Sequence, residues 1–408
     1  MLRPSLFVRD GSGTGLREMP AVSNSQSRKF LLDVSRLIWR IWRRRLPTGI
    51  DRVCLEYVER LGSRSQAVVQ FKGSTFVLSP SNSDRLFFLL RNPARCSRAN
   101  LLNAALRALP TATRAPPSRD MFYLNVGHTG LDEPALPSWI AKFGLHAIYL
   151  VHDLIPLTHP HYCRAGEGQK HARRIQNVLA SARGVIVNSH DTLTELSRFA
   201  TSVDRKMPAA VTAWIAGNKV AARIQPKSSD RPYFVTVGTI EIRKNHPILL
   251  DVWERLVRSM GPNAPELLVI GQRGWKAEAT FRRLDNLGPI AGHVREITDC
   301  DDQELASWIA GARALLMPSF VEGFGLPVIE ALDLGTPVIA SDLPVFREVA
   351  GDIPTFLDPN DTGAWEAAVR SFAKDSPERA SQLARMAKYQ PPTWDDHFRT
   401  VEDWLDTL

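Results

Sequence analysis

Short apolar runs alternate with amphipathic stretches along most of the chain. The stretches "HAIYLVHDLIPL" (146–157) and "RGVIVNSHDTLTEL" (183–196) each open with consecutive apolar residues and continue into polar ones. Strands that are buried on both faces of a parallel sheet have this pattern, and helices between them cover the sheet. The pattern therefore predicts an α/β fold. The predicted strands lie within 30–38, 121–127, 146–157, 183–196, 232–240, 265–272, 313–319 and 336–341.

The segments between these runs show helical spacing or turn chemistry. Residues 246–260 and 301–312 are amphipathic and predict helices. A further helix follows the Thr48-Gly49 turn, with its apolar positions at Ile50, Val53, Leu55 and Val58. Residues 67–79 predict a hairpin around Lys72-Gly73, and Ser189 or Asp191 is placed to cap a helix. Residues 110–119 predict a loop.

Two strand-and-helix series are separated by a less patterned stretch at 201–231. A chain of 408 residues suits two domains. We expect domains at 30–215 and 231–385, joined by a linker at 216–230, with a flexible tail at 1–29. Residues 386–408 predict a terminal helix, with a return to the N-terminal domain as one option; Trp394, Phe398, Val401 and Leu405 form its apolar side.

The composition adds a basic surface and a reducing environment to this picture. Lys and Arg number 51 against 43 Asp and Glu, so the formal charge is +8. Such a surface suits phosphorylated small molecules, acidic lipid surfaces or nucleic acid, and does not choose between them. The four cysteines (Cys54, Cys96, Cys163 and Cys300) lack metal-ligand spacing, and no apolar run is long enough for a spanning helix or a signal peptide. These features predict a cytoplasmic protein.

The stretch "FVEGFGLPVIEALDLGTPVIAS" (320–341) carries two glutamates around a tight turn. Gly323 and Gly325 let the backbone approach a ligand closely, Pro327 suits the first turn of a helix, and Gly335 ends that helix. Glu322 and Glu330 then lie near a helix N-terminus, where carboxylates can accept hydroxyls of a sugar or ribose. The alternative is structural, because such spacing is common and Glu330 can simply complement the helix dipole.

Three motifs together resemble the retaining GT-B glycosyltransferases of family 4. They are "PSFVEGFGLPVIEALDLGTPVIASDLPVFREV" (318–349), "VGTIEIRKNHPILLDVW" (237–253) and "VHDLIPL" (151–157), the last being most similar to mannosyltransferase-like members. The resemblance is strong over about 230–370 and weaker over 30–200. It implies two Rossmann-like doubly wound domains that face a cleft, and a nucleotide-sugar donor bound between them.

The resemblance also implies roles for individual residues. Glu322 would hold hydroxyls of the donor sugar, Glu330 would take the ribose hydroxyls, and Arg243 with Lys244 would clamp the diphosphate. His152 would lie near the reacting sugar, although a histidine at a strand end is often structural. The remaining donor-binding positions implied are Gly49, Gly238, Thr239, Gly323, Phe324, Gly325 and Leu326, with Asn125 and His128 as weaker candidates.

Thr239 departs from the family pattern, because many relatives carry an arginine directly after the glycine of this strand end. Arg243 must then act beside Lys244. If these two cations and helix ends oppose the charge on the departing phosphate, no metal is needed. The acids of "DCDDQEL" (299–305) are better explained as a helix cap. We therefore expect no metal and no cofactor besides the donor substrate.

The resemblance implies transfer of a sugar with retention at its anomeric carbon. The acceptor would attack from the side that the phosphate leaves, and a phosphate oxygen would take the proton. We favour mannose from GDP-mannose as the donor, with another GDP-, UDP- or dTDP-sugar as the alternative. The acceptor would be a glycan or a lipid-linked oligosaccharide in bacterial polysaccharide assembly.

The segment "SRLIWRIWRRR" (35–45) mixes Trp39 and Trp42 with five arginines. Aromatic-basic mixtures suit an anionic membrane surface, which would place the protein at the inner face of the cytoplasmic membrane; a charged turn with both tryptophans in the core is the alternative. Rival functions are an epimerase or a sugar phosphorylase on the same fold, and a basic adaptor. Nucleic acid is not expected as a partner, since no helix-turn-helix, zinc spacing or aromatic RNA platform is recognisable.

Overall fold

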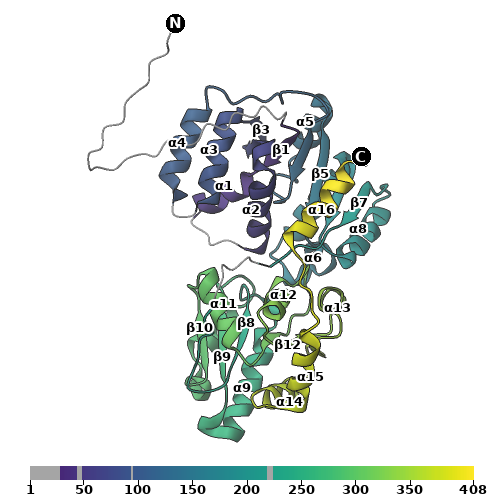
Figure 1. Ribbon diagram of the computed structural model, residues 1–408. Coiled ribbons are helices and arrows are strands. Elements are labelled where there is room, and N and C mark those ends of the chain that lie inside the picture. Colours follow the sequence, from purple (N-terminus) through teal and green to yellow (C-terminus); the bar gives the residue numbers. More distant parts are fainter. Residues whose placement is uncertain (1–27, 44–47, 93–94, 218–223) are drawn as a thin grey trace, which may run out of the picture.

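The computed structural model describes residues 28–43, 48–92, 95–217 and 224–408, and they form two lobes (Figure 1). Each lobe contains one sheet with helices on both of its faces. The predicted tail at 1–29 falls almost wholly outside the described residues, as do Arg44, Arg45 and part of the predicted linker. The α/β prediction with two doubly wound sheets is confirmed.

The N-terminal lobe contains a seven-stranded sheet with the order β3-β2-β1-β4-β5-β6-β7. All neighbouring strands are parallel except β2 and β3, which form the predicted hairpin around Lys72-Gly73. The strands are β1 (Phe30–Asp33), β2 (Ser65–Phe71), β3 (Ser74–Val77), β4 (Phe122–Asn125), β5 (His146–Val151), β6 (Ala182–Val187) and β7 (Ala209–Thr212). The helices are α1 (Ser35–Trp42), α2 (Gly49–Leu61), α3 (Pro80–Arg91), α4 (Arg98–Ala108), α5 (Ala135–Phe143), α6 (Ile155–Thr158), α7 (Glu167–Ser181) and α8 (His190–Ser202).

The C-terminal lobe contains a six-stranded parallel sheet with the order β10-β9-β8-β11-β12-β13. Its strands are β8 (Tyr233–Val237), β9 (Glu266–Ile270), β10 (Val294–Ile297), β11 (Leu315–Met317), β12 (Val338–Ser341) and β13 (Thr355–Leu357). Its helices are α9 (His246–Met260), α10 (Glu278–Asp285), α11 (Asp302–Gly311), α12 (Leu326–Asp333), α13 (Pro344–Ala350), α14 (Thr362–Phe372) and α15 (Pro377–Met386).

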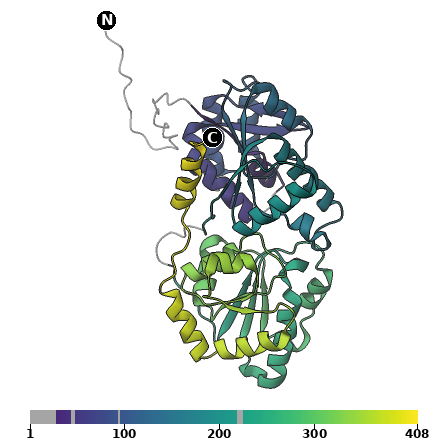
Figure 2. The same cartoon turned by 90° about the vertical axis from the view of Figure 1, so that its right-hand side faces the viewer.

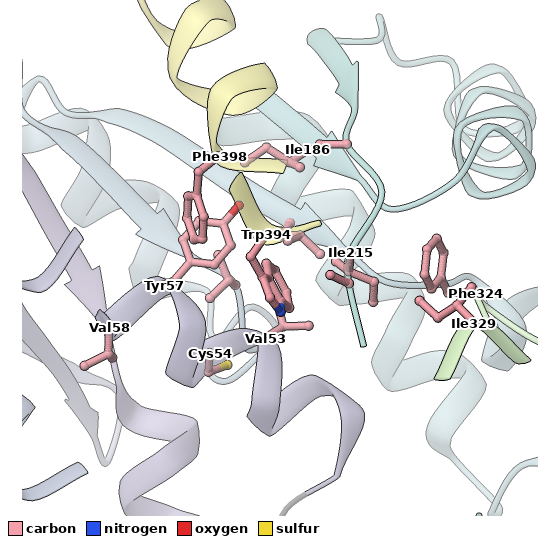
Figure 3. Close-up of a cluster of buried hydrophobic side chains, with 14 of the residues drawn as sticks. Val53, Cys54, Tyr57, Val58, Ile186, Ile215, Phe324, Ile329, Trp394 and Phe398 are labelled. Carbon is pink, nitrogen blue, oxygen red and sulfur yellow. The ribbon is translucent and has the colours of Figure 1, made fainter. Parts of the chain in front are cut away.

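The last helix, α16 (Trp394–Leu405), leaves the C-terminal lobe and packs on the N-terminal one (Figures 1 and 2). The Tyr57 hydroxyl lies 2.9 Å from His397 Nε2, and Arg64 pairs with Glu402 at 2.9 Å. Figure 3 shows Tyr57 of α2 beside Phe398 and Trp394 of α16. The same buried cluster includes Phe324 and Ile329 of the other lobe, so the apolar contacts run across the lobe boundary.

One predicted strand ends earlier than expected. The strand predicted at 30–38 stops at Asp33, because its side chain accepts a hydrogen bond from the Ser35 N–H at 2.9 Å and α1 begins there. The run at 146–157 leaves the sheet after Val151, where its polar residues begin as predicted, and continues into α6. The predicted helix caps are confirmed. The Ser189 side chain accepts a hydrogen bond from the Thr192 N–H, and the Asp301 side chain accepts one from the Glu304 N–H.

Candidate active site

The strand order reverses at one point in each sheet, between β1 and β4 in the N-terminal lobe and between β8 and β11 in the C-terminal lobe. In the C-terminal sheet, β8 and β11 are neighbours although other elements lie between them in sequence. Ligands of open α/β sheets bind outside the carboxyl ends of strands at such a switch point. The loops that follow β8 and β11 are residues 238–245 and 318–325, which contain the two motifs predicted to hold the donor.

Glu322, Arg243 and Lys244 form one buried cluster at this switch point. Arg243 Nη1 donates to Glu322 Oε2 at 2.7 Å, and Lys244 Nζ donates to Oε1 at 2.5 Å. The Ser319 hydroxyl also donates to Oε1, at 2.7 Å. The two cations and the acid that the sequence suggested are therefore in direct contact.

Electrostatics keep Glu322 ionised. Burial alone would raise the pKa of Glu322, but Arg243 and Lys244 outweigh it and lower that pKa to about 2. The same contacts act on Arg243: burial opposes its charge, while Glu322 and Glu241 raise its pKa above the usual range. A buried carboxylate thus orients two cations whose side chains are largely buried.

Glu241 is a fourth member of the cluster that the sequence analysis missed. Its Oε1 lies 2.6 Å from Arg243 Nε, and its side chain is 2% exposed. Among the described residues Glu241 Oε2 has no hydrogen-bond partner. Burial raises the pKa of Glu241, against the opposing effect of Arg243 and Lys244. The only hint in the sequence was an acidic residue two positions before Arg243. The spacing alone could not show that the Glu241 side chain points toward Arg243.

The turn after β11 approaches the N-terminal lobe closely. A Cβ on Gly323 would lie 2.9 Å from Asp153 Cβ and 3.0 Å from the His152 carbonyl oxygen. Gly325 has φ +100°, a conformation that favours glycine, and Phe324 between them is buried. The end of β5 in one lobe and the turn of the other therefore form a single surface.

Glu330 has a different partner from Glu322. It lies in α12, and its Oε1 accepts from Arg52 Nη1 of the N-terminal lobe at 3.2 Å. Arg52 also pairs with Asp302 at the start of α11. Glu330, Asp302 and Asp333 line a small pocket together with apolar residues of α11 and α12. The two glutamates therefore face separate parts of the lobe boundary.

Gly238 and Gly49, two of the predicted donor-binding glycines, lie close to side chains of the candidate site. Gly238 has φ +134°, and a Cβ there would lie 3.4 Å from both Lys244 Cε and Lys244 Nζ. A Cβ on Gly49 would lie 3.0 Å from Cδ1 of Leu326, so the N-terminal Gly49 loop meets the start of α12. The Thr239 side chain packs against Gly274, whose added Cβ would lie 2.5 Å from Thr239 Cγ2.

His152 belongs to a buried group of three histidines. His152 Nε2 lies 2.8 Å from the Val126 carbonyl oxygen, and His128 Nε2 lies 2.9 Å from that of Leu150. The rings of His128 and His152 are 5.0 Å apart, and His171 follows at 5.9 Å from His128. Burial lowers the pKa of His152 to about 4 and that of His128 well below its usual value. Both rings are therefore neutral near pH 7.

Asn125, the weaker candidate, belongs to a structural network. Its Nδ2 donates to the Tyr123 hydroxyl at 3.1 Å and to the Thr129 carbonyl at 3.0 Å. The Tyr123 hydroxyl in turn donates to the buried Asp33 at 2.8 Å. Asn125 therefore helps to hold the loop that carries His128.

A second contact between the lobes was also absent from the sequence analysis. The Tyr162 ring stacks on Phe320, with centroids 5.6 Å apart. Trp275 Nε1 donates to the Tyr162 carbonyl at 3.3 Å, and Lys276 Nζ donates to the His161 carbonyl at 2.9 Å. Phe320 stands two residues before Glu322, so this aromatic contact lies next to the candidate site. Its partners are far apart in sequence, which is why no local pattern revealed it.

The described residues contain neither a cluster of metal ligands nor a membrane-spanning helix. Within 28–43, 48–92, 95–217 and 224–408, no group of three or more His, Cys, Asp or Glu side chains is arranged to hold a metal ion. No helix over these ranges has both the length and the apolar character needed to cross a membrane.

Comparison with known proteins agrees with this architecture. Residues 219–390 match the family of glycosyl transferases group 1. The chain is 28% identical over 375 residues to O-antigen chain mannosyltransferase B of Escherichia coli, covering 86% of this chain and 93% of that protein. It is 37% identical over 186 residues to O-antigen chain mannosyltransferase RfbU of Salmonella typhimurium, covering 45% of this chain and 49% of that protein.

A solved structure supports the fold independently. Anabaena HepE in complex with UDP and glucose matches with a TM-score of 0.64 at 13% identity, over 93% of this chain and 99% of that one. The protein has the two-domain, Rossmann-like GT-B fold. Together with the family match and the relatives, the fold supports a group 1 glycosyltransferase.

Proposed function

We propose that this protein transfers mannose from GDP-mannose to a glycan or lipid-linked oligosaccharide in bacterial polysaccharide assembly, with retention at the anomeric carbon. The observation that carries the proposal is the Glu322 carboxylate held between Arg243 and Lys244, against the end of β5. The mannosyltransferase names of the two O-antigen relatives support the choice of sugar.

The proposed chemistry divides the cluster between sugar and phosphate. Arg243 uses Nε and Nη1 in its bonds to Glu241, Val321 and Glu322, and Nη2 takes part in none of these. Nη2 and the Lys244 ammonium would then contact the diphosphate, where negative charge grows as the sugar departs. Glu322 would accept hydroxyls of the sugar, and its low pKa keeps it an acceptor at neutral pH.

Acceptor attack is proposed on the face that the phosphate leaves. The protein would hold the acceptor on the same face of the anomeric carbon as the departing phosphate and oppose the developing charge, and a phosphate oxygen would take the acceptor proton. The closely packed His152, Asp153 and Gly323 would border the reacting sugar. NMR of the product tests retention, because the coupling constant at the anomeric carbon distinguishes the two configurations. An inverted product would remove this part of the proposal.

Metal-independence is a proposal of the same kind. Arg243 and Lys244, which both donate to Glu322, would supply the positive charge that a divalent cation supplies in a metal-dependent transferase. Transfer is therefore expected to persist in excess EDTA. Loss of transfer in EDTA, with recovery on adding Mg²⁺ or Mn²⁺, would contradict it.

The donor is tested by binding before transfer. GDP-mannose should raise the unfolding temperature of the full chain more than UDP- or dTDP-sugars at equal concentration. A larger shift with a different GDP-, UDP- or dTDP-sugar would reassign the donor and leave the transferase proposal intact. No shift with any nucleotide sugar, even at high concentration, would contradict the enzyme proposal.

Variants then separate binding from chemistry. Glu322→Ala should abolish turnover, and Lys244→Ala should weaken both donor binding and rate. Glu322→Gln keeps the size of the side chain but removes its charge, and we expect a loss of about 100-fold or more in kcat. Near-normal transfer by any of these variants would contradict the role proposed for that residue. Glu296→Gln, at an ion pair of β10 with Arg273, is a suitable control.

We further propose action at the cytoplasmic face of a membrane, where a lipid-linked acceptor would be found. The four cysteines are free, as expected in a reducing compartment. In the described part of the segment predicted to touch lipid, residues 35–43, Arg36 and Arg40 pair with Asp51 at 2.6 and 3.1 Å, which offsets part of its positive charge. Cofloatation of the protein with anionic vesicles tests membrane contact, and failure to bind at low salt would contradict it.

A further inference from the structure

The outer face of α4 exposes three leucines. Leu102, Leu106 and Leu109 are 49%, 56% and 68% exposed, and they follow one another at intervals of four and three residues. Residues at this spacing lie on the same face of a helix. Leu101 and Ala108 lie on another face and are buried against the lobe. In Figure 1, α4 is the outermost helix on its side of the N-terminal lobe.

The sequence on either side of these leucines carries only positive formal charge, and in the fold Arg91 of α3 pairs with the exposed Glu59 at 3.6 Å. Residues 85–119 contain seven arginines and no lysine, aspartate or glutamate. Of these arginines, Arg91, Arg95, Arg98 and Arg107 are exposed on or beside α4. An apolar stripe surrounded by arginine matches the two components of an anionic bilayer surface, acyl chains below and phosphates above.

Trp42, the last residue of α1, adjoins this face through Arg98. Its side chain is 43% exposed, Arg98 Nε donates to its carbonyl oxygen at 2.7 Å, and the Arg98 guanidinium lies 5.7 Å from its ring centre. An exposed tryptophan beside arginine suits the polar-apolar boundary of a bilayer. The α1 helix that ends at Trp42 also carries Arg36, which donates to Thr48 Oγ1 at 3.3 Å in the loop before Gly49.

We propose that the α4 face, defined here as Leu102, Leu106, Leu109, Trp42 and the surrounding arginines, docks on an anionic phospholipid surface. The leucines enter the acyl boundary while the arginines contact lipid phosphates. Because α1 connects this face to the Gly49 loop, docking brings a lipid-linked acceptor toward the lobe boundary. The inference rests on the proposed membrane-linked acceptor, but vesicle binding needs neither donor nor turnover.

The experiment compares the full chain with a triple variant, Leu102→Gln/Leu106→Gln/Leu109→Gln. Glutamine keeps helix propensity and leaves the net charge unchanged. Binding is measured by sedimentation with vesicles of phosphatidylglycerol and phosphatidylethanolamine at low and high salt. The parent should bind, and the variant should bind about tenfold or more weakly, since each exposed leucine contributes apolar transfer. Equal binding by the variant would overturn the proposal.

Charge reversal supplies a second, independent measurement. Arg107→Glu lies on α4, whereas Arg258→Glu lies on the exposed side of α9 in the other lobe and makes the same change in net charge. Arg107→Glu should weaken vesicle binding and its salt dependence more than Arg258→Glu. Equal effects would show that overall charge, rather than this face, governs binding, and would overturn the proposal.

Two alternatives to lipid docking by the α4 face would give different experimental results. If the triple variant changes the oligomeric state without changing vesicle binding, the face binds a second copy and the proposal is wrong. If a chain beginning at residue 28 loses vesicle binding while the triple variant keeps it, the preceding segment is the lipid element and the proposal is wrong. A GDP-mannose thermal shift that is the same in parent and variant separates these results from failure of the proposed transfer.

Discussion

Arg52 of α2 donates to Glu330 of α12 across the lobe boundary, at 3.2 Å from Nη1 to Oε1. The same guanidinium pairs with Asp302. Glu330 is the residue proposed to accept the ribose hydroxyls, so in this arrangement an arginine of the opposite lobe occupies its carboxylate. Bound nucleotide and Arg52 would then compete for one acceptor.

Arg52→Gln is therefore expected to tighten binding of GDP. Partly exposed ion pairs contribute about 0.5–1 kcal/mol, which corresponds to an improvement of about two- to fivefold in Kd. Isothermal titration of GDP measures it, with Arg52→Lys as the charge-retaining control. Weaker binding by Arg52→Gln would mean that Arg52 contacts the phosphates itself, and would contradict the competition.

Acid sensitivity is predicted from His397, which joins the C-terminal helix to the N-terminal lobe. Burial lowers the pKa of His397 to about 4, from an ordinary value of 6.5. The unfolded chain therefore takes up this proton at a higher pH than the folded one, so stability falls as the pH drops from 6.5 toward 4. His397 is therefore expected to lower the free energy of unfolding by about 2 kcal/mol at pH 5 relative to pH 7.5.

Removing His397 should flatten that dependence. His397→Gln loses contacts to Tyr57 and to the Trp214 carbonyl, so it is expected to be less stable at pH 7.5. The difference from the parent should shrink by about 2 kcal/mol between pH 7.5 and pH 5 in guanidinium unfolding. The control is His161→Gln at an exposed position. A difference that stays constant with pH would contradict the prediction.

Much of the fold was predictable because short, near-continuous apolar runs between amphipathic segments are typical of buried strands in a parallel sheet. The segment 30–38 shows the limit of this reasoning, because its apolar residues fit the period of a strand as well as that of a helix. The Ser35 N–H donates to the Asp33 side chain, and the helix α1 begins there. Residues 80–108 received no prediction, although α3 and α4 lie there. Propensity alone is weak where tertiary packing selects the structure.

The motifs gave the residues of the candidate site but not its contacts. The sequence suggested that Glu322, Arg243 and Lys244 act on one ligand, and the fold brings them into direct contact. The sequence did not indicate the ion pair between Arg52 and Glu330 or the stacking of Tyr162 on Phe320, because the residues of each pair belong to different lobes. Such contacts depend on how the two lobes meet, which local periodicity does not encode.

Glu241 is predicted to act by positioning Arg243. Its Oε1 fixes Arg243 Nε at 2.6 Å, while Glu322 holds the other end of the guanidinium. Glu241→Ala should lower kcat/KM by about tenfold or more, since a freed guanidinium no longer points at the phosphate. Glu241→Gln keeps an acceptor oxygen in place and should retain most of the activity. Initial rates at several donor concentrations measure both variants, and full activity of Glu241→Ala would exclude the role.

The close approach at Gly323 gives the last prediction. Gly323→Ala would place a Cβ 2.9 Å from Asp153 Cβ and 3.0 Å from the His152 carbonyl oxygen, so the turn and the end of β5 must move apart by a few tenths of an ångström. Gly292→Ala is the matched control, because its Cβ would meet nothing within 4 Å. We expect Gly323→Ala to lower kcat by about tenfold or more, since small displacements of reacting groups are costly, and Gly292→Ala to leave it unchanged. GDP binding should change little in either variant, because Arg243 and Lys244 stay in place. Unchanged kcat in Gly323→Ala would show that transfer does not depend on contact between these two loops.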